Sequence, residues 1–229
     1  MVRLHEYLDY STIAYRNFNE AHSALMQYCD SCYFYDASQF YSSDAQFYAI
    51  YKDNELIFAI RGSSSLKDFW TDSKIAIVQA DDVLKQCKDE GVHLGFLQQF
   101  KSIKDQIFTS VESSTKLNIT FVGHSLGGAL ATLCSASVKS HFPEKIVSCI
   151  TFGSPRVGNK AFATTFNYII NYSCRCVNNF DAVTLRPYWG YQHVGGEHKI
   201  GNKPTPWFIY FGYVEDHYLT KYKESLDKK

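Results

Sequence analysis

One stretch, ITFVGHSLGGALATL at residues 119–133, constrains the fold of this chain more than any other. A run of β-branched and aromatic residues stops at Gly123, presents Ser125, and continues through two further glycines into an alanine-rich segment. The first part predicts a buried strand and the last part a helix. Small residues around a single hydroxyl relieve the crowding of a tight strand-to-helix turn. The stretch therefore predicts a chain that alternates strands with helices and holds Ser125 at the end of a strand.

The same turn has the spacing of a nucleophile motif. Gly123-His124-Ser125-Leu126-Gly127 fits G-x-S-x-G, and it lies between a strand and a helix, which is the context that this motif requires. The start of a helix places backbone N–H groups and the positive end of the helix dipole beside the hydroxyl, which suits a developing oxyanion. The alternative is a glycine-rich turn that only allows close strand–helix packing. We interpret Ser125 as a candidate nucleophile.

The apolar patterns in the rest of the chain support an architecture in which strands alternate with helices. Strands that alternate with helices imply right-handed crossovers and a largely parallel sheet. Residues 45–62 predict two strands about an Asp53-Asn54 turn, and residues 207–210 predict a final edge strand. The other expected helices are 7–29, 95–111, 127–140 and 159–169, and the other expected strands are 117–122, 145–152 and 172–177.

A serine hydroxyl needs an imidazole to accept its proton and a carboxylate to orient that imidazole. On such a scaffold the acid and then the histidine follow the serine in the sequence. Asp181 comes just after the expected strand 172–177, at the edge of the sheet where ligands of open α/β sheets bind. Its alternative is a turn-forming role. His193, His198 and His217 follow it, and the position of His217 before a short closing helix favours it slightly.

Composition excludes several classes of protein. The 229 residues carry 23 basic and 23 acidic side chains, so the net charge indicates neither nucleic acid nor an anionic surface as a partner. Of the seven cysteines, Cys29 and Cys32 form a CxxC without a second pair at zinc spacing, so no metal site is expected. No apolar run reaches the ~18 residues of a membrane span. No linker or repeat divides the chain, which predicts a single domain over residues 1–229.

Seven segments together resemble the class 3 lipases, the fungal triacylglycerol lipase type of α/β-hydrolase. They occur in the order of that family and cover most of the chain: FAIRGSSSLKDFWTD, VHLGFLQQF, FVGHSLGGALATL, TFGSPRVGN, VNNFDAVTLRP, GYQHVGGE and EDHYLTKY. The resemblance implies an α/β-hydrolase fold, with a mostly parallel central sheet, helices on both faces and a short lid helix. It implies Ser125 as nucleophile, Asp181 as orienting acid and His217 as general base, and no cofactor. His93 and His193 match family positions that hold loops.

The resemblance also assigns an oxyanion hole and a lid. Ser63, in RGSSS, is implied as one oxyanion donor, and the Leu126 N–H as the other. Residues 64–72, SSLKDFWTD, align with the lid of the family, in which Leu66, Phe69 and Trp70 would form an apolar face that covers the site and contacts lipid when it opens. The alternative is that Phe69 and Trp70 pack permanently into the protein body.

The expected activity is serine-dependent hydrolysis of carboxylic esters through an acyl-enzyme, with acylglycerols as the leading substrates. A feruloyl, aryl or short-chain esterase is the alternative within the same chemistry, because a triad does not define the acyl group. A lipase-like binding or signalling protein without turnover is the alternative of another class. The expected partners are a lipid or ester substrate and a lipid interface. The sequence leaves open the oligomeric state and whether the location is cytoplasmic or, after removal of a signal peptide, secreted.

Overall fold

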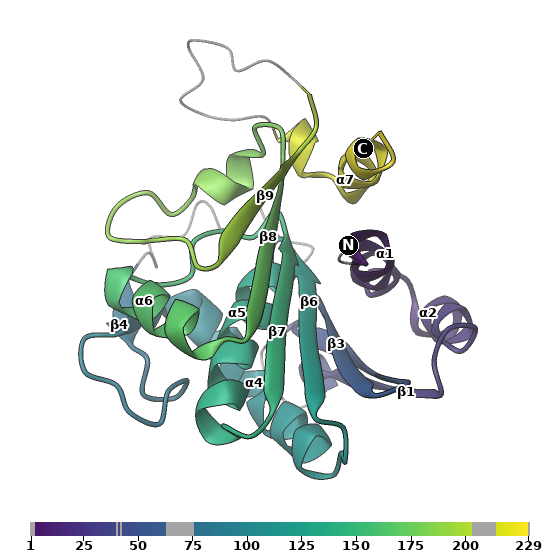
Figure 1. Cartoon of the computed structure of the whole chain (residues 1–229), viewed down its shortest axis with the longest axis horizontal. Coiled ribbons are helices and arrows are strands. Elements are labelled where there is room, and N and C mark those ends of the chain that lie inside the picture. Colours follow the sequence, from purple (N-terminus) through teal and green to yellow (C-terminus); the bar gives the residue numbers. More distant parts are fainter. Residues whose placement is uncertain (1–2, 40, 42, 63–75, 203–213, 229) are drawn as a thin grey trace.

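A seven-stranded sheet forms the centre of the molecule (Figure 1). The computed structural model describes residues 3–39, 41, 43–62, 76–202 and 214–228. The strands lie in the order β1-β2-β3-β6-β7-β8-β9; β1 to β3 are antiparallel neighbours, and β3 and the four strands after it are parallel. The strands are β1 (Ser31–Asp36), β2 (Gln46–Lys52), β3 (Glu55–Arg61), β6 (Asn118–His124), β7 (Ile146–Phe152), β8 (Tyr172–Asn178) and β9 (Gly196–Ile200). The mostly parallel sheet expected from the sequence is confirmed.

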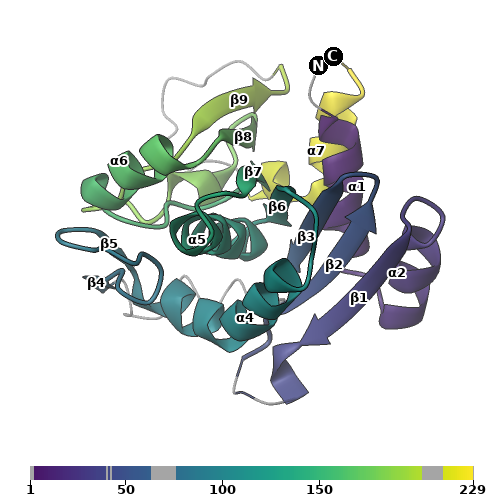
Figure 2. The same cartoon turned by 60° about the horizontal axis from the view of Figure 1, so that its bottom comes forward.

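Helices cover both faces of this sheet (Figures 1 and 2). On one face α5 (Leu126–His141) packs against β6 and β7, with α4 (Leu94–Glu112) and α6 (Lys160–Ile169) beside it. On the other face α1 (Leu4–Ile13) packs against β3 and β6, and α7 (Leu219–Leu226) contacts α1, β8 and β9. Because the helices cover the faces of the sheet, the loops that lead from the parallel strands to the next elements lie at the carboxyl ends of these strands.

The core is divided by the sheet into two apolar clusters. On the side of α5, Phe58 and Phe121 stack with ring centroids 4.9 Å apart inside the larger cluster. On the side of α1, Ile57 and Val122 belong to the second cluster, together with Tyr222 from α7. Adjacent residues of β3 and β6 are therefore buried on opposite faces, as expected for parallel strands covered on both sides.

The N-terminal segment differs from the single helix expected over residues 7–29. It forms two helices, α1 and α2 (Phe18–Leu25), because Asn17 begins a second helix by accepting a hydrogen bond from the Glu20 N–H at 3.0 Å. The α2 helix lies beside the edge strand β1 (Figure 2). Alanines and aromatics recur at helical spacing on both sides of Asn17, so the sequence pattern did not reveal that one helix ends and another begins there.

Both edge strands, β1 and β9, were also missing from the expected elements. The β9 sequence, GEHKI, has only Ile200 buried, so it lacks the apolar alternation that identifies a strand. The strand expected at 207–210 lies outside the described residues. The β2–β3 hairpin is confirmed, with Asp53 at φ 47° in its turn. A small two-stranded sheet pairs β4 (Ile77–Gln79) with β5 (Gly91–His93), and short 3₁₀ turns are η1 (Ala37–Gln39), η2 (Ala182–Leu185) and η3 (Glu215–His217).

No helix in the described ranges combines the length and the apolar character that a membrane crossing needs.

Candidate active site

The carboxyl ends of β6, β7 and β8 meet at one edge of the sheet. The register pairs His124, the last residue of β6, with Phe152, the last residue of β7. The chain then turns, and the Ser125 N–H donates to the Phe152 carbonyl at 2.9 Å. Asp181 follows the end of β8, and η3 brings His217 to the same edge. Parallel pairing thus gathers residues that are far apart in the sequence.

Ser125 lies in a strained turn between β6 and α5. Its φ of 59° and ψ of −126° are unusual for a residue with a side chain, and the residue is 1% exposed. Two glycines permit the turn: a Cβ on Gly123 would stand 2.3 Å from the Gly127 carbonyl oxygen, and one on Gly127 would stand 2.3 Å from the Ile60 carbonyl oxygen. Helix α5 begins at the next residue, Leu126. The role expected for small residues around this serine is confirmed.

Asp181 and His217 form a buried hydrogen-bonded pair. The Nδ1 of His217 lies 2.8 Å from Oδ2 and 3.0 Å from Oδ1 of Asp181, whose side chain is fully buried. The carboxylate also accepts the Val183 N–H on Oδ1 at 2.9 Å and the Tyr222 hydroxyl on Oδ2 at 2.7 Å. Three donors therefore fix the orientation of the carboxylate, and the carboxylate fixes the orientation of the imidazole.

Tyr222 is a member of this site that the sequence did not identify. It is fully buried in α7, and burial together with the nearby Asp181 carboxylate raises the pKa of its phenol well above the usual value. The phenol therefore stays protonated and donates to Asp181. The only sequence signal was its place five residues after His217 in EDHYLTKY, a spacing that fits a tyrosine packed in the core equally well.

Gly153, after β7, makes room for the Asp181–His217 pair. Its φ is +61°, and a Cβ built on it would stand 2.6 Å from Asp181 Oδ2 and 2.9 Å from His217 Nδ1. Any larger residue here would displace one of the two side chains. The backbone immediately after β7 thus forms part of the wall of the site.

Two buried polar atoms at this edge have no hydrogen-bond partner among the described residues: Ser125 Oγ and His217 Nε2. They are a hydroxyl and the outward nitrogen of an imidazole whose other nitrogen is already bonded to a carboxylate. Buried polar atoms are rarely left unsatisfied, because each costs about 1–3 kcal/mol of folding free energy. Candidate catalytic hydrogen bonds are commonly long before substrate binds. The two orphaned atoms are the ones that would exchange a proton in a serine hydrolase.

The imidazole of His124 packs against that of His217. The two rings have centroids 4.4 Å apart and an interplanar angle of 31°. Burial, and then the neighbouring His217, lower the pKa of His124 well below its usual value, so His124 is neutral at physiological pH. Its Nε2 lies 2.7 Å from the carbonyl oxygen of His217. A neutral ring that carries its proton on Nε2 therefore supports the backbone of the residue at the centre of the site.

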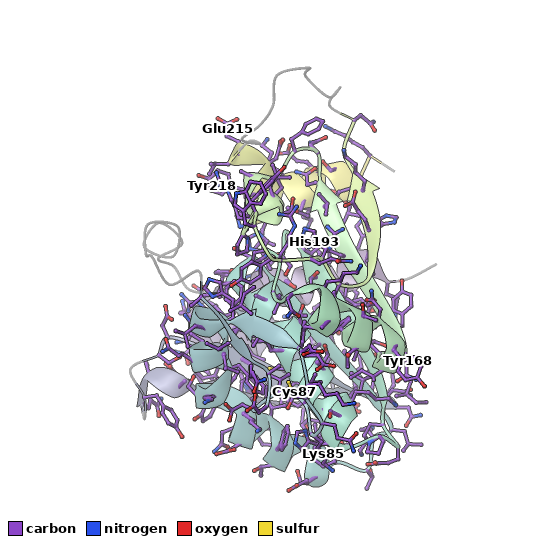
Figure 3. The ribbon with its side chains drawn as sticks, turned by 90° about the vertical axis from the view of Figure 1, so that its left-hand side faces the viewer. Lys85, Cys87, Tyr168, His193, Glu215 and Tyr218 are labelled. Carbon is purple, nitrogen blue, oxygen red and sulfur yellow. The ribbon has the colours of Figure 1, made fainter. Side chains whose placement is uncertain are left out.

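The three other histidines singled out by the sequence lie outside the Asp181–His217 pair. His193 Nε2 lies 2.7 Å from the Thr184 carbonyl oxygen, a contact consistent with its expected role in holding a loop, and His93 caps α4 by accepting the Gly95 N–H at 3.1 Å. His198 lies within β9. Glu215 and Tyr218 stand on either side of Asp216 and His217 in the sequence. Figure 3 shows them on the same side of the molecule as His193.

Asp216, next to His217 in the sequence, points to another partner. Its Oδ2 accepts a hydrogen bond from the Phe180 N–H at 3.3 Å, while Asp181 bonds the imidazole.

Four residues expected at the site lie outside the described residues: the oxyanion donor Ser63 and the lid residues Leu66, Phe69 and Trp70. Leu126, the other expected oxyanion donor, is the first residue of α5 and is 3% exposed. Within the described ranges there is no group of three or more His, Cys, Asp or Glu residues with the geometry of a metal site.

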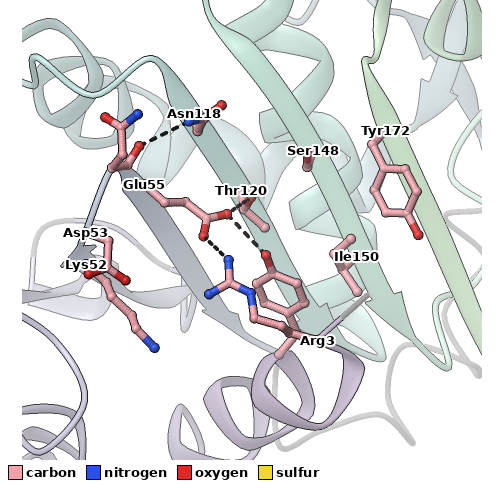
Figure 4. Close-up of a pocket in the computed structure, with 11 residues that line it drawn as sticks. Arg3, Lys52, Asp53, Glu55, Asn118, Thr120, Ser148, Ile150 and Tyr172 are labelled. Atoms are coloured by element: carbon pink, nitrogen blue, oxygen red, sulfur yellow. Dashed lines mark hydrogen bonds and ion pairs between the residues drawn. The ribbon is translucent and has the colours of Figure 1, made fainter. Parts of the chain in front are cut away.

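A separate cavity of about 460 Å³ lies at the opposite edge, where the parallel strands begin (Figure 4). Glu55, one of the two carboxylates among its lining residues, accepts hydrogen bonds from Arg3 at 3.1 Å and from the Tyr7 hydroxyl at 3.2 Å, and it also accepts from Thr120. None of the described residues that line this cavity is a histidine. The cavity therefore lacks the serine–imidazole chemistry of the carboxyl edge.

Comparison with known proteins places this geometry in context. Residues 57–191 match the family model described as lipase (class 3). The chain is 32% identical over 157 residues to a secreted mono- and diacylglycerol lipase of Fusarium solani, a match that covers 66% of this chain and 45% of the relative. It is 29% identical over 175 residues to phospholipase A1-II 1 of Oryza sativa, covering 67% and 44% respectively. The chain thus spans about half the length of these curated relatives.

Solved structures share the fold. Lipase II of Rhizopus niveus superimposes with a TM-score of 0.77 at 22% identity, over 94% of this chain and 92% of that protein. A lipase of Rhizopus microsporus var. chinensis gives a TM-score of 0.76 at 21% identity, over 95% and 86%. The α/β-hydrolase fold expected from the sequence is confirmed. The family model covers more than half of the chain and includes the Ser125 turn and Asp181, and on this basis the chain belongs to the class 3 lipases.

Proposed function

We propose that this protein hydrolyses carboxylic esters through a covalent acyl-enzyme on Ser125. The observation that carries the proposal is the buried Asp181–His217 pair at the strand edge where Ser125 occupies a strained turn, with Ser125 Oγ and His217 Nε2 both unsatisfied. A group of this kind that only stabilised the fold would be expected to satisfy its polar atoms internally.

In the proposed first half-reaction, Ser125 Oγ attacks the ester carbonyl carbon while His217 Nε2 accepts the hydroxyl proton. Asp181 keeps the other proton of the imidazole on Nδ1 and stabilises the imidazolium that forms. The imidazolium then protonates the alkoxide leaving group, and the alcohol departs as the carbonyl reforms. The acyl group remains on Ser125 as an ester.

In the second half-reaction, water takes the place of the alcohol. His217 accepts a proton from water, the resulting hydroxide attacks the acyl carbon, and Ser125 Oγ leaves with the proton returned by His217. The oxyanion of each tetrahedral intermediate would be bound by the Leu126 N–H and by Ser63. Loss of one such donor costs about 3–4 kcal/mol in the activation barrier.

Acylglycerols are the substrate class that we propose. The support is the family match and the names of two relatives, a mono- and diacylglycerol lipase and a phospholipase A1, both of which denote cleavage of glycerol-linked acyl esters. Contact with a lipid interface through Leu66, Phe69 and Trp70 belongs to the same proposal. Feruloyl, aryl and short-chain esters are the alternatives within this chemistry.

The activity test uses the full chain and p-nitrophenyl esters. Ser125→Ala is expected to lower kcat by about 10⁶-fold, with circular dichroism and thermal unfolding unchanged. His217→Asn should match it. Hydrolysis that survives Ser125→Ala would remove the assignment of the nucleophile, and an inactive wild-type chain would favour a lipase-like binding protein.

The substrate test compares short and long acyl chains below and above the concentration at which the substrate forms aggregates. A long-chain preference with a rise in rate at the interface supports acylglycerol hydrolysis. A preference for short-chain or feruloyl esters, with no rise at the interface, would replace the lipase proposal with a simple esterase.

A further inference from the structure

Tyr15, at the end of the segment that contains α1, has a hydroxyl at the back of the candidate active site. The hydroxyl lies 3.3 Å from Nδ1 of His124 and 3.4 Å from the carbonyl oxygen of the same residue. Both acceptors therefore belong to the residue that immediately precedes Ser125. Tyr15 lies outside the 57–191 region that defines the family match.

The partners of His124 determine the direction of these hydrogen bonds. The carbonyl oxygen of His217, 2.7 Å from Nε2, can only accept, so Nε2 carries the proton of the ring. Because His124 is neutral, Nδ1 is then an acceptor. The Tyr15 O–H consequently donates to His124. Burial raises the pKa of Tyr15 to about 12, so the phenol keeps this proton at physiological pH.

The Tyr15 oxygen also contacts Gly62, the last described residue before the segment that contains Ser63. A Cβ placed on Gly62 would stand 2.8 Å from the Tyr15 oxygen and 2.9 Å from the Gly127 nitrogen, so the three groups are closely packed. The guanidinium of Arg61 covers the Tyr15 ring at 5.7 Å from its centroid.

We propose that Tyr15 and His124 are positioning residues that join two catalytic segments through one continuous hydrogen-bonded chain and pack against a third. The chain runs from the Tyr15 hydroxyl to His124 Nδ1, and from His124 Nε2–H to the His217 carbonyl, while Gly62 packs against the Tyr15 oxygen. The hydrogen bonds link the nucleophile turn to the backbone of the base, and Tyr15 also packs against Gly62, the residue that precedes Ser63 in the sequence. Neither residue contacts the ester, so each acts only through the groups it holds.

This inference rests on the proposed hydrolase function and predicts how strongly positioning contributes to it. Tyr15→Phe removes the two hydrogen bonds of the hydroxyl and leaves the ring. We expect kcat to fall about tenfold with little change in KM, because a shift in alignment raises the barrier without removing a substrate contact. The affinity for a boronic acid, which forms a tetrahedral adduct on serine, should fall by a similar factor.

Tyr10→Phe is the matched control. Tyr10 is a buried tyrosine of the same N-terminal segment, and its hydroxyl donates to Glu6 at 2.8 Å. Both variants lose a hydroxyl, and both should show a similar small loss in the free energy of unfolding. Only Tyr15→Phe should lower kcat and boronic acid affinity.

A spectroscopic readout separates positioning from general stability. In Tyr15→Phe, the ¹⁵N resonance of His124 Nδ1 should move toward that of an imine nitrogen without a hydrogen bond, while Tyr10→Phe leaves it in place. His124→Gln should lower kcat further, and Tyr15→Phe added to it should cause less than its own tenfold loss, since Tyr15 acts through His124.

The outcomes distinguish this inference from the proposed function. If Ser125→Ala abolishes hydrolysis but Tyr15→Phe matches Tyr10→Phe in kcat, boronic acid affinity and ¹⁵N spectrum, the hydrolase stands and the chain of positioning contacts is wrong. Full additivity of Tyr15→Phe and His124→Gln would also overturn it. Hydrolysis that survives Ser125→Ala would remove the function itself.

Discussion

At the scale of single residues, the arrangement of the site depends on which side-chain atoms can donate a hydrogen bond and which can only accept one. The Asp181 carboxylate has acceptors only, and His217, Val183 and Tyr222 supply the donors around it. With one imidazole nitrogen held in this way, the proton of a neutral His217 stays on Nδ1, and Nε2 is left as the acceptor. The chemistry that we propose for Ser125 follows from this single assignment of a proton.

Tyr222→Phe tests the contribution of the hydroxyl to this arrangement. It removes one hydrogen bond to a buried carboxylate, an interaction worth about 1.5–3 kcal/mol. We expect kcat to fall about 10-fold or more, with KM nearly unchanged, in steady-state hydrolysis of a soluble ester. Tyr218→Phe is the control, because Tyr218 is 57% exposed and adjacent to the same histidine. Equal kcat in the two variants would show that Tyr222 only fills space.

Asp181→Asn tests the orienting carboxylate itself. Asparagine keeps the shape and can offer its amide group to His217, which favours the wrong tautomer of the imidazole. We expect kcat to fall by about 10⁴-fold while the fold is retained, measured by hydrolysis at saturating substrate and by circular dichroism. A loss below 10-fold would identify a different residue as the orienting acid.

At the scale of secondary structure elements, the position of Ser125 depends on how closely α5 approaches the sheet. The Ile60 carbonyl of β3 and the start of α5 are in contact at Gly127, where there is no space for a side chain. The strain at Ser125 is therefore sustained by packing between the helix and two strands. This explains in physical terms why glycines surround the serine in the sequence.

Gly127→Ala should move α5 away from β3. The added methyl group would overlap the Ile60 carbonyl oxygen, and overpacking of this kind costs about 1–3 kcal/mol in the free energy of unfolding. Urea unfolding should show this loss. Gly196→Ala in β9 is the control, because a Cβ there meets nothing within 4 Å. If both variants have the stability of the wild type, the close approach of α5 is not required.

Elements with strong apolar patterns could be predicted from the sequence, and those with weak patterns could not. The helices α4, α5 and α6 and the strands β6, β7 and β8 all appear within a few residues of their expected bounds. The helix α5 and the three strands are buried along most of their length, while α4 and α6 each bury apolar residues at helical spacing, so their patterns are clear. The edge strand β9 is largely polar, and the break between α1 and α2 depends on one side-chain cap at Asn17.

At the scale of the whole molecule, the site combines segments that no local pattern relates. The order of the expected strands and helices was enough to bring Ser125 and Asp181 to one edge, and position together with family resemblance favoured His217. The supporting residues were not predictable, because Tyr15 and Tyr222 reach the site from helical segments near opposite ends of the chain. Their importance depends on tertiary contacts alone.

The whole molecule should also lose stability in acid, because it buries neutral histidines. Burial lowers the pKa of His93 to about 4 and that of His193 to about 3, and the pKa of His124 is lowered as well. In the unfolded chain these groups have a pKa near 6.5. Between these values the unfolded chain binds more protons than the folded one, so the free energy of unfolding falls as the pH falls below about 6.5.

His93→Asn isolates one part of this effect. For His93 the shift corresponds to about 2 kcal/mol of stability lost between pH 7 and pH 5. Asparagine can still cap α4 but does not titrate, so the variant should lose about 2 kcal/mol less than the wild type over that range, measured by urea unfolding at both pH values. An unchanged difference between the two pH values would contradict the neutral, buried state of His93.

The central claim is that Ser125 is activated by His217, and covalent labelling tests it most directly. A fluorophosphonate forms a P–O bond with an activated serine and releases fluoride, and intact-protein mass spectrometry with peptide mapping locates the adduct. We predict one adduct per chain, on Ser125, formed rapidly by the wild type, slowly by His217→Asn and not at all by Ser125→Ala. Equal labelling of wild type and His217→Asn, or an adduct on a different serine, would contradict the account.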